Sequence, residues 1–329
     1  MRGICEEPTN GASLPHALIV AGPTASGKSA LALGLAQRLN GTIINADAMQ
    51  CYRELRIVTA RPSPDDEAAA PHTLYGIRPA AEPGNAAWWR DAALAEMHKA
   101  HAQGRLPILC GGTGMYLSTL TDGIAAIPEC GEDARAEARF LLAEQGPHGL
   151  HAALAKVDQA TAARLRPSDS QRVARAWEVW RGTGRGLAAW QAETPLPAPW
   201  RFTAILLDPP RDILRAAITQ RLDAMLAQGV VAEVRNFLTL GLDPALPAMR
   251  AHGVPELGAY LRGETDLPTA IARIATATSQ YTKRQATWFR HRRMAAVGRT
   301  HTIQNRIGDF TQFSERIQAE ILSFIQDKG

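Results

Sequence analysis

The residues with the clearest chemical potential form a glycine-rich segment near the start of the chain. Residues 22–29 read GPTASGKS, which fits the pattern G-x-x-x-x-G-K-[ST]. In such a segment the backbone N–H groups turn toward one point, a lysine adds a full positive charge, and a serine hydroxyl can bind magnesium. A chance glycine-rich turn is the alternative, but this segment lies between a predicted strand and a predicted helix. It therefore predicts a di- or triphosphate site, with Ser29 as a metal ligand and with these binding residues: Gly22, Thr24, Ala25, Ser26, Gly27, Lys28 and Ser29.

Acidic residues at the ends of predicted strands bear on which reaction such a segment serves. A P-loop kinase or ATPase needs an aspartate at the end of an apolar strand to help hold magnesium. Asp208 is one candidate, but it lies far along the chain and is followed by two prolines. The strand before Thr113 ends in Cys110-Gly-Gly and carries no acid. This incomplete set weakens the hypothesis of a small-molecule kinase without removing it.

Short apolar segments alternate with segments of helical periodicity along much of the chain. Uninterrupted apolar runs of this length are typical of buried parallel strands. Such alternation predicts an α/β fold, a P-loop NTPase-like parallel sheet with helices on both faces. We expect strands at 17–21, 42–45, 107–110 and 202–207, and helices at 29–39, 86–103, 212–228, 231–240, 255–262, 268–292 and 311–325.

The alternation is interrupted once. From about residue 128 to residue 200 the pattern is helical, with no convincing strand, and three prolines at 195, 197 and 199 close the segment. A helical block between two parts of an α/β pattern predicts an inserted, all-helical domain. The expected organisation, after a loose leader at 1–15, is a first core part at 16–126, the insert at 127–200, a second core part at 201–293 and a C-terminal tail at 294–329.

Charge is distributed unevenly over the 329 residues. The composition is ordinary for a globular protein, with 46% hydrophobic and 21% charged residues, and the formal net charge is +4. Between residues 280 and 306, however, seven Lys and Arg residues occur without any Asp or Glu. A basic stretch interleaved with aromatic residues favours an anionic partner such as nucleic acid.

Cysteine use and hydropathy indicate the compartment. Cys5, Cys51, Cys110 and Cys130 form no C-x-x-C pair, which favours reduced thiols over a zinc site or a disulfide framework. No apolar run approaches the roughly 20 residues of a membrane span. Glu6 and Glu7 stand where a signal peptide needs its apolar stretch. We expect a cytoplasmic protein without a membrane partner.

Three more segments complete a recognisable set. Residues 45–52 read NADAMQCY, residues 111–117 read GGTGMYL, and residues 283–290 read KRQATWFR. With the P-loop, their order and spacing resemble the tRNA dimethylallyltransferase (tRNA isopentenyltransferase) family from about residue 17 to residue 293. The resemblance implies transfer of a dimethylallyl group from dimethylallyl diphosphate to the exocyclic amine of the adenosine on the 3′ side of the anticodon. It also implies a requirement for Mg²⁺ and an inserted helical domain that grips the anticodon stem-loop of tRNA; we expect a monomer.

The same resemblance assigns catalytic residues. Asp47 matches the family's general base, which removes a proton as the amine attacks. Thr113 matches a threonine near the leaving oxygen, and Arg221 matches an arginine on the diphosphate, where negative charge grows during transfer. The alternatives are a helix cap or a magnesium ligand for Asp47, a turn residue for Thr113 and a solvated helix face for Arg221.

The resemblance also assigns contacts with tRNA, although each basic residue among them could equally be a solvated surface residue. The target base must leave its stack to reach a buried site. Gln171 and Arg175, at i and i+4, would share a helix face. The expected contacts are Asp47, Ala48, Met49, Gln50, Arg135, Gln171, Arg172, Arg175, Arg250, His252, Lys283 and Arg284.

Several positions depart from the family pattern, and other functions remain open. Residues that differ from the common family residue are Ala48, Val58, Arg61, Ala217, Ser279 and the Gly-Val-Pro run at 253–255. These departures affect details of diphosphate and tRNA contact, while the P-loop, Asp47 and Thr113 are retained. The alternatives are a prenyltransferase acting on free adenine nucleotides, a small-molecule kinase and a non-catalytic RNA-binding module.

Overall fold

The computed structural model describes residues 14–193 and 195–328. Cys5, Glu6, Glu7 and most of the predicted leader at 1–15 lie outside these residues. The chain divides into two compact units. The sheet unit consists of Met1–Thr121 with Ala198–Gly329, and the helical unit is Asp122–Pro197, close to the insert predicted at 127–200.

The strands of the sheet unit form a parallel sheet in the order β3-β2-β4-β1-β5-β6. The sheet confirms the predicted parallel α/β core, and the central strand β1 is buried almost throughout. Because all strands run the same way, the loops after β1, β2, β4 and β5 emerge at one edge. The strands are β1 (His16–Ala21), β2 (Gly41–Asn45), β3 (His72–Thr73), β4 (Leu106–Gly111), β5 (Arg201–Leu207) and β6 (Thr300–Ile303).

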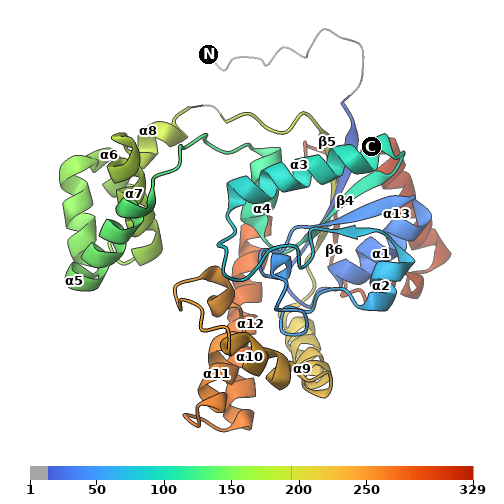
Figure 1. Cartoon of the computed structure of the whole chain (residues 1–329). Coiled ribbons are helices and arrows are strands. Elements are labelled where there is room, and N and C mark those ends of the chain that lie inside the picture. The colour runs from blue at the N-terminus through green and yellow to red at the C-terminus, as the bar shows by residue number, and fades with distance from the viewer. Residues whose placement is uncertain (1–13, 194, 329) are drawn as a thin grey trace. The chain divides into compact units, whose positions relative to one another are not determined.

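Helices cover both faces of the sheet (Figure 1). Helices α1 (Lys28–Arg38) and α13 (Glu315–Lys328) pack on one face through a core that includes Leu31, Leu35 and Ile325. On the other face lie α3 (Ala86–Ala102) and α4 (Gly114–Thr121), which bury Trp89 and Leu117. A short helix, α2 (Pro64–Ala69), begins with a capping box at Ser63.

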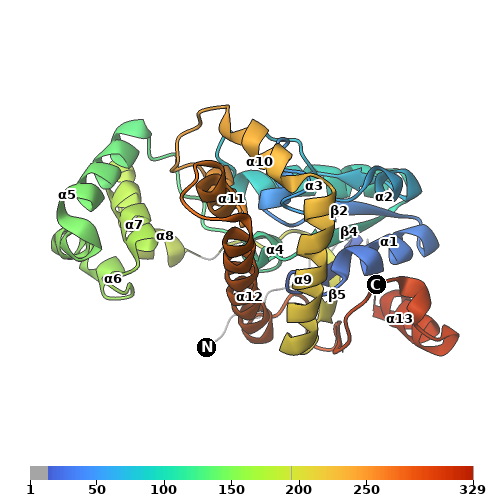
Figure 2. The ribbon, with the colours of Figure 1, turned by 90° about the horizontal axis from the view of Figure 1, so that it is seen from below.

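A further group of helices packs beside the loop that follows β2. Figure 2 shows α9 (Arg211–Ala227) and α12 (Leu267–His291) running side by side. With α10 (Val230–Leu238) and α11 (Val254–Leu261), they bury an apolar cluster that also takes in Tyr52, Leu55 and Val58. The bounds of α9–α12 agree with the predicted helices to within two residues.

Residues 294–329, which sequence patterns leave as a tail, are part of the sheet unit. Strand β6 adds to β5, and Ile303, Ile307, Phe310 and Ile321 are buried against α1 and the sheet. The strand escaped prediction because it has four residues, of which only Ile303 is buried. The final helix begins at Glu315, later than the expected residue 311.

The helical unit contains α5 (Glu132–Val157), α6 (Gln159–Ala162), α7 (Ser170–Thr183) and α8 (Leu187–Gln191). Helix α5 is interrupted at Gly146, where φ is 65° and a proline follows. Leu150, Leu154 and Val173 form the centre of its core. No strand occurs in the part of this unit that the structure describes. Across the described residues of the chain, no helix has the length and apolar character needed to span a membrane.

Candidate active site

The glycine-rich segment forms a tight loop between β1 and α1. Ala25 and Gly27 adopt left-handed backbone conformations, with φ values of 67° and 92°. Lys28 begins α1 and is buried, whereas Ser29 is exposed. The hydroxyl of Ser26 is buried and has no hydrogen-bond partner among the described residues. A buried polar atom without a partner is unusual and indicates a loop shaped for a polar ligand.

Asp47 stands at the carboxyl end of β2, where Asn45 orients it. The side chain of Asn45 accepts a hydrogen bond from the Asp47 N–H (2.8 Å) and donates one to the Asp47 carbonyl (2.9 Å). Asp47 Oδ1 in turn accepts from the N–H of Met49 at 3.1 Å, so one carboxylate oxygen caps a short turn. Its other oxygen, Oδ2, accepts no hydrogen bond from residues 14–193 or 195–328. That oxygen is therefore available to a ligand.

Thr113 joins the loops that follow β2 and β4. Its hydroxyl accepts a hydrogen bond from the N–H of Ala48 at 3.0 Å, and its own N–H donates to the carbonyl of Ala46 at 3.1 Å. The residue after Asp47 is thereby held next to the glycine-rich loop at 111–114. Thr113 thus lies beside Asp47, as its strand-end position leads one to expect.

Arg221 reaches the same region from α9. Its Nη2 donates to the carbonyl of Thr59 at 3.1 Å, and Gln50 Nε2 donates to the same carbonyl at 2.9 Å. Glu233 fixes the preceding turn, because its carboxylate accepts hydrogen bonds from the N–H groups of residues 56, 57 and 58. Gln50 was expected to contact the target base, but its side-chain amide donates hydrogen bonds to the carbonyls of Thr59 and Ala60. Glu233 was not suggested by the sequence.

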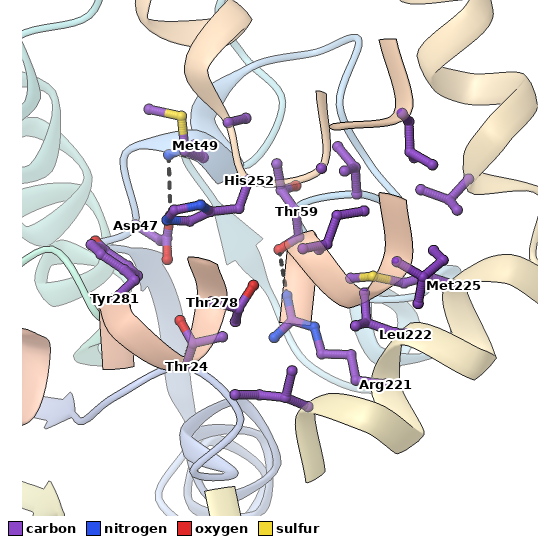
Figure 3. Close-up of a pocket in the computed structure, with 18 residues that line it drawn as sticks. Thr24, Asp47, Met49, Thr59, Arg221, Leu222, Met225, His252, Thr278 and Tyr281 are labelled. Atoms are coloured by element: carbon purple, nitrogen blue, oxygen red, sulfur yellow. Dashed lines mark hydrogen bonds between the residues drawn. The ribbon is translucent and has the colours of Figure 1, made fainter. Parts of the chain in front are cut away.

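Asp47 and Arg221 border one pocket, which lies entirely within the sheet unit (Figure 3). Its empty space of about 790 Å³ includes open solvent. Asp47, His252 and Tyr281 group at one side of it, with Thr24 and Arg221 nearby. The rest of the wall is largely apolar and comes from the loop after β2 and from α9 to α12: Met49, Val58, Ile218, Leu222, Met225, Val230, Leu257, Ile271 and Ile274. Such a wall suits a hydrocarbon group, and the polar side suits an anion and a base.

The charge of Asp47 acts on several groups around the pocket. Burial lowers the pKa of Lys28, and the Asp47 carboxylate opposes this shift most strongly. Burial likewise lowers the pKa of Arg221, against the same carboxylate. Burial, reinforced by Asp47, raises the pKa of Tyr281 to about 12, although hydrogen bonds with Thr113 and Gln285 act in the opposite direction. The Asp47 carboxylate thus favours the positively charged forms of two neighbouring side chains, Lys28 and Arg221.

Gln285 connects α12 to the phosphate loop and was not assigned a role from the sequence. Its Oε1 accepts hydrogen bonds from the N–H (2.9 Å) and hydroxyl (3.2 Å) of Thr24. Its Nε2 donates to the carbonyl of Gly112 at 2.9 Å. Tyr281 lies one turn earlier on the same helix face. The sequence signals were the place of Gln285 in the segment KRQATWFR at 283–290 and its spacing of four from Tyr281.

Replacing Gln285 by leucine is expected to lower kcat/KM about tenfold, because it leaves buried polar groups of both loops unpaired, at about 1–3 kcal/mol each. Steady-state kinetics measure the loss in kcat/KM, and thermal unfolding measures the loss of stability from the unpaired groups. Gln280→Leu, at an exposed position of the same helix, is the matched control. Unchanged kinetics in Gln285→Leu would show that the contact between α12 and the loop is dispensable.

The residues expected at tRNA fall into two groups. Lys283, Arg284 and Arg250 are exposed on the sheet unit and make no ion pair with any described residue, while Met49 and His252 line the pocket. In the helical unit, arginines have acidic neighbours: Arg135 pairs with Glu129 and Glu132, Arg172 with Asp169, and Arg175 with Glu178. Gln171 is exposed. Surface pairs of this kind are weak, so an anion can displace them.

Asp208, the acid that a kinase would need, is engaged elsewhere. Both of its carboxylate oxygens accept from Arg290, at 2.8 and 2.9 Å. Nor do three His, Cys, Asp or Glu side chains gather as a metal site anywhere in the described part of the chain. Ser29 is an exposed residue, and its hydroxyl is a suitable ligand for a magnesium ion that takes most of its other ligands from phosphate and water.

The chain matches known proteins over most of its length. Residues 50–292 match the family described as IPP transferase, and residues 15–81 match the one described as Isopentenyl transferase. The tRNA dimethylallyltransferase of Granulibacter bethesdensis is 61% identical over 94% of this chain and 98% of its own. That of Acidiphilium cryptum is 62% identical over 94% of both chains.

Solved structures agree. The tRNA isopentenylpyrophosphate transferase of Bacillus halodurans aligns with a TM-score of 0.67 and 30% identity, over 96% of this chain and 98% of that one. A eukaryotic dimethylallyltransferase acting on tRNA shares the fold, with a TM-score of 0.78 at 24% identity, over 96% and 80% of the two chains. The chain therefore belongs to the IPP transferase family, together with the bacterial tRNA dimethylallyltransferases.

Proposed function

We propose that this protein transfers a dimethylallyl group from dimethylallyl diphosphate to the exocyclic amine of the adenosine on the 3′ side of the anticodon in tRNA. One observation carries the proposal. An apolar pocket is bordered both by the phosphate loop, through Thr24, and by a carboxylate, Asp47, that has a free oxygen. A prenyl diphosphate and an incoming base can meet there.

The phosphate loop would hold the leaving group. Backbone N–H groups at the start of α1 and the ammonium of Lys28 would bind the diphosphate, and Arg221, which lines the same pocket from α9, would add a second cation. As the carbon–oxygen bond breaks, the electron pair stays on the diphosphate, so these cations stabilise the transition state more than the ground state. Magnesium bound at Ser29 would neutralise part of the same charge.

Asp47 would take the proton. The exocyclic nitrogen attacks the first carbon of the prenyl group with its lone pair and becomes cationic unless a proton leaves. The Oδ2 atom of Asp47 can accept that proton, while Oδ1 stays bonded to the N–H of Met49 and keeps the carboxylate oriented. Thr113 supports this arrangement by holding Ala48, the next residue.

The choice of tRNA over a free nucleotide rests on surfaces beyond the pocket. A small acceptor needs neither the helical unit nor the exposed Lys283 and Arg284 beside the pocket residue Tyr281. Phosphate contacts by such residues bring salt-dependent affinity. We also propose that the protein acts as a monomer in the cytoplasm.

The kinase alternative is disfavoured by Asp208. Its carboxylate is committed to Arg290 by two hydrogen bonds, so the strand-end acid that would help hold magnesium is not available. The prenyl-transfer proposal needs no acid at that position.

A single incubation series tests the proposal. The protein and Mg²⁺ are mixed with dimethylallyl diphosphate and either unmodified tRNA or AMP, and in a third tube with labelled ATP. Nucleoside mass analysis should find one added isoprene unit, on the adenosine beside the anticodon, in the tRNA tube alone. Prenylated AMP with unchanged tRNA would favour the free-nucleotide enzyme, and phosphate transfer without prenylation would favour a kinase. Binding of tRNA without transfer of a prenyl or phosphate group would favour a non-catalytic RNA-binding module.

A further inference from the structure

We propose that the segment from β6 to Ile307 is a clamp that positions the phosphate loop for the diphosphate, with Arg306 as its replaceable contact. In the sequence, this segment stands out only because Arg306 ends the basic stretch at 280–306. The proposal rests on the proposed function, because a diphosphate is the ligand that the loop is held to receive.

The contact includes two hydrogen bonds. Arg306 Nε donates to the carbonyl of Ala25 at 3.1 Å, and the N–H of Ile307 donates to the carbonyl of Ser26 at 3.0 Å. Both acceptors are consecutive carbonyls of the phosphate loop, some 280 residues earlier in the chain. No residue lies between the two segments: a Cβ atom placed on Gly27 would overlap the backbone of Ile307.

These two carbonyls matter because of peptide geometry. In a planar trans peptide the C=O and the N–H point in opposite directions. Holding the carbonyl of Ser26 against the clamp therefore turns the N–H of Gly27 to the other side, where the anion binds. Holding the carbonyl of Ala25 directs the N–H of Ser26 to the carbonyl of Pro23 at 3.2 Å, the hydrogen bond that closes the phosphate loop. The left-handed conformation of Ala25, φ 67°, is unfavourable for a residue with a Cβ atom and needs such outside support.

The clamp is anchored on both sides of the contact. Before it, β6 pairs with β5, and the carbonyl of Ile303 accepts from the N–H of Asp208 at 2.9 Å. After it, Phe310 is buried against Gly34 of α1, and the guanidinium of Arg38 lies 4.5 Å from its ring centre. The loop carrying Arg306 is therefore held at both ends, which lets it hold the phosphate loop in turn.

Arg306 is the residue to change, because its side chain is exposed and the buried Ile307 acts through its backbone. Arg306→Met keeps the length of the chain and removes the donor. We expect its Kd for inorganic pyrophosphate with Mg²⁺, measured by titration calorimetry, to rise about threefold to tenfold, the net contribution of an ordinary hydrogen bond, here the bond from Arg306 to the carbonyl of Ala25. The KM for dimethylallyl diphosphate should rise in parallel, with the KM for tRNA and the unfolding temperature unchanged.

Two further variants make the result specific. Arg306→Lys restores a cation and a donor and should recover part of the affinity. Arg316→Met removes an exposed arginine of α13 that forms an ion pair with Glu320, and it should behave as wild type.

Three outcomes would overturn the clamp: wild-type pyrophosphate affinity in Arg306→Met, an equal rise of KM for both substrates, or a lowered unfolding temperature that accounts for the loss. Failure of the wild-type protein itself to bind pyrophosphate would instead contradict the proposed function, and the clamp with it.

Discussion

Asp47→Ala is expected to lower kcat about a hundredfold to ten-thousandfold, the range by which a positioned general base contributes, and to leave tRNA affinity near the wild-type value. The reason is that the attacking amine must lose a proton to a group with a free acceptor, and Oδ2 of Asp47 is such an acceptor at the pocket. Single-turnover prenylation and filter binding of tRNA measure the two quantities separately.

Asp47→Asn separates the base from the cap. The amide oxygen of asparagine can still accept from the N–H of Met49, so the turn at 49–51 should persist, but the side chain can no longer take a proton. We expect this variant to be as slow as Asp47→Ala and to unfold at the wild-type temperature. Normal turnover in Asp47→Asn would reduce Asp47 to a capping residue.

Lys28→Met should reduce kcat/KM for dimethylallyl diphosphate about a hundredfold to a thousandfold, comparable with the removal of one preorganised charge-stabilising donor. Lys28 is buried at the start of α1, where it supplies the full positive charge of the phosphate loop. Burial lowers the pKa of Lys28, and the negative charge of Asp47 raises it. The negative charge of a bound diphosphate would further stabilise the protonated, positively charged form of Lys28. Steady-state kinetics and pyrophosphate titration give the measurement.

Lys99→Met is the matched control for Lys28→Met. Lys99 is an exposed lysine on α3 with a single acidic neighbour, Glu96, so its loss should change neither rate nor affinity. Wild-type affinity for pyrophosphate in Lys28→Met would place the diphosphate somewhere other than the loop at 22–29.

The parallel sheet and its edge were predictable because the signals for them are local. The apolar runs before Gly22, Ala46 and Gly111 each mark a buried strand, and parallel strands deliver their following loops to one edge. That is why Asp47 and Thr113 could be expected near the phosphate loop without coordinates.

What escaped prediction depends on contacts between distant segments. Gln285 binds Thr24 across 261 residues, and Ile307 binds Ser26 from a segment with almost no periodic signal. Arginines in the helical unit illustrate the same limit, because their spacing suits RNA while Arg135 and Arg175 have acidic partners. The sequence pattern predicts which faces of helices and strands are apolar, but it does not predict which polar groups form hydrogen bonds with one another.

In the proposed reaction, one pocket brings the diphosphate and the adenosine amine together at Asp47. A crystal structure with an anticodon stem-loop and a non-reactive thiolodiphosphate analogue of the prenyl donor would show whether they meet there. We predict the diphosphate on the N–H groups of residues 27–29 and on Lys28, with the exocyclic amine of the extruded adenosine in hydrogen-bond contact with Asp47. An adenosine that stays stacked in the loop, or that enters with its amine directed away from residue 47, would contradict the account.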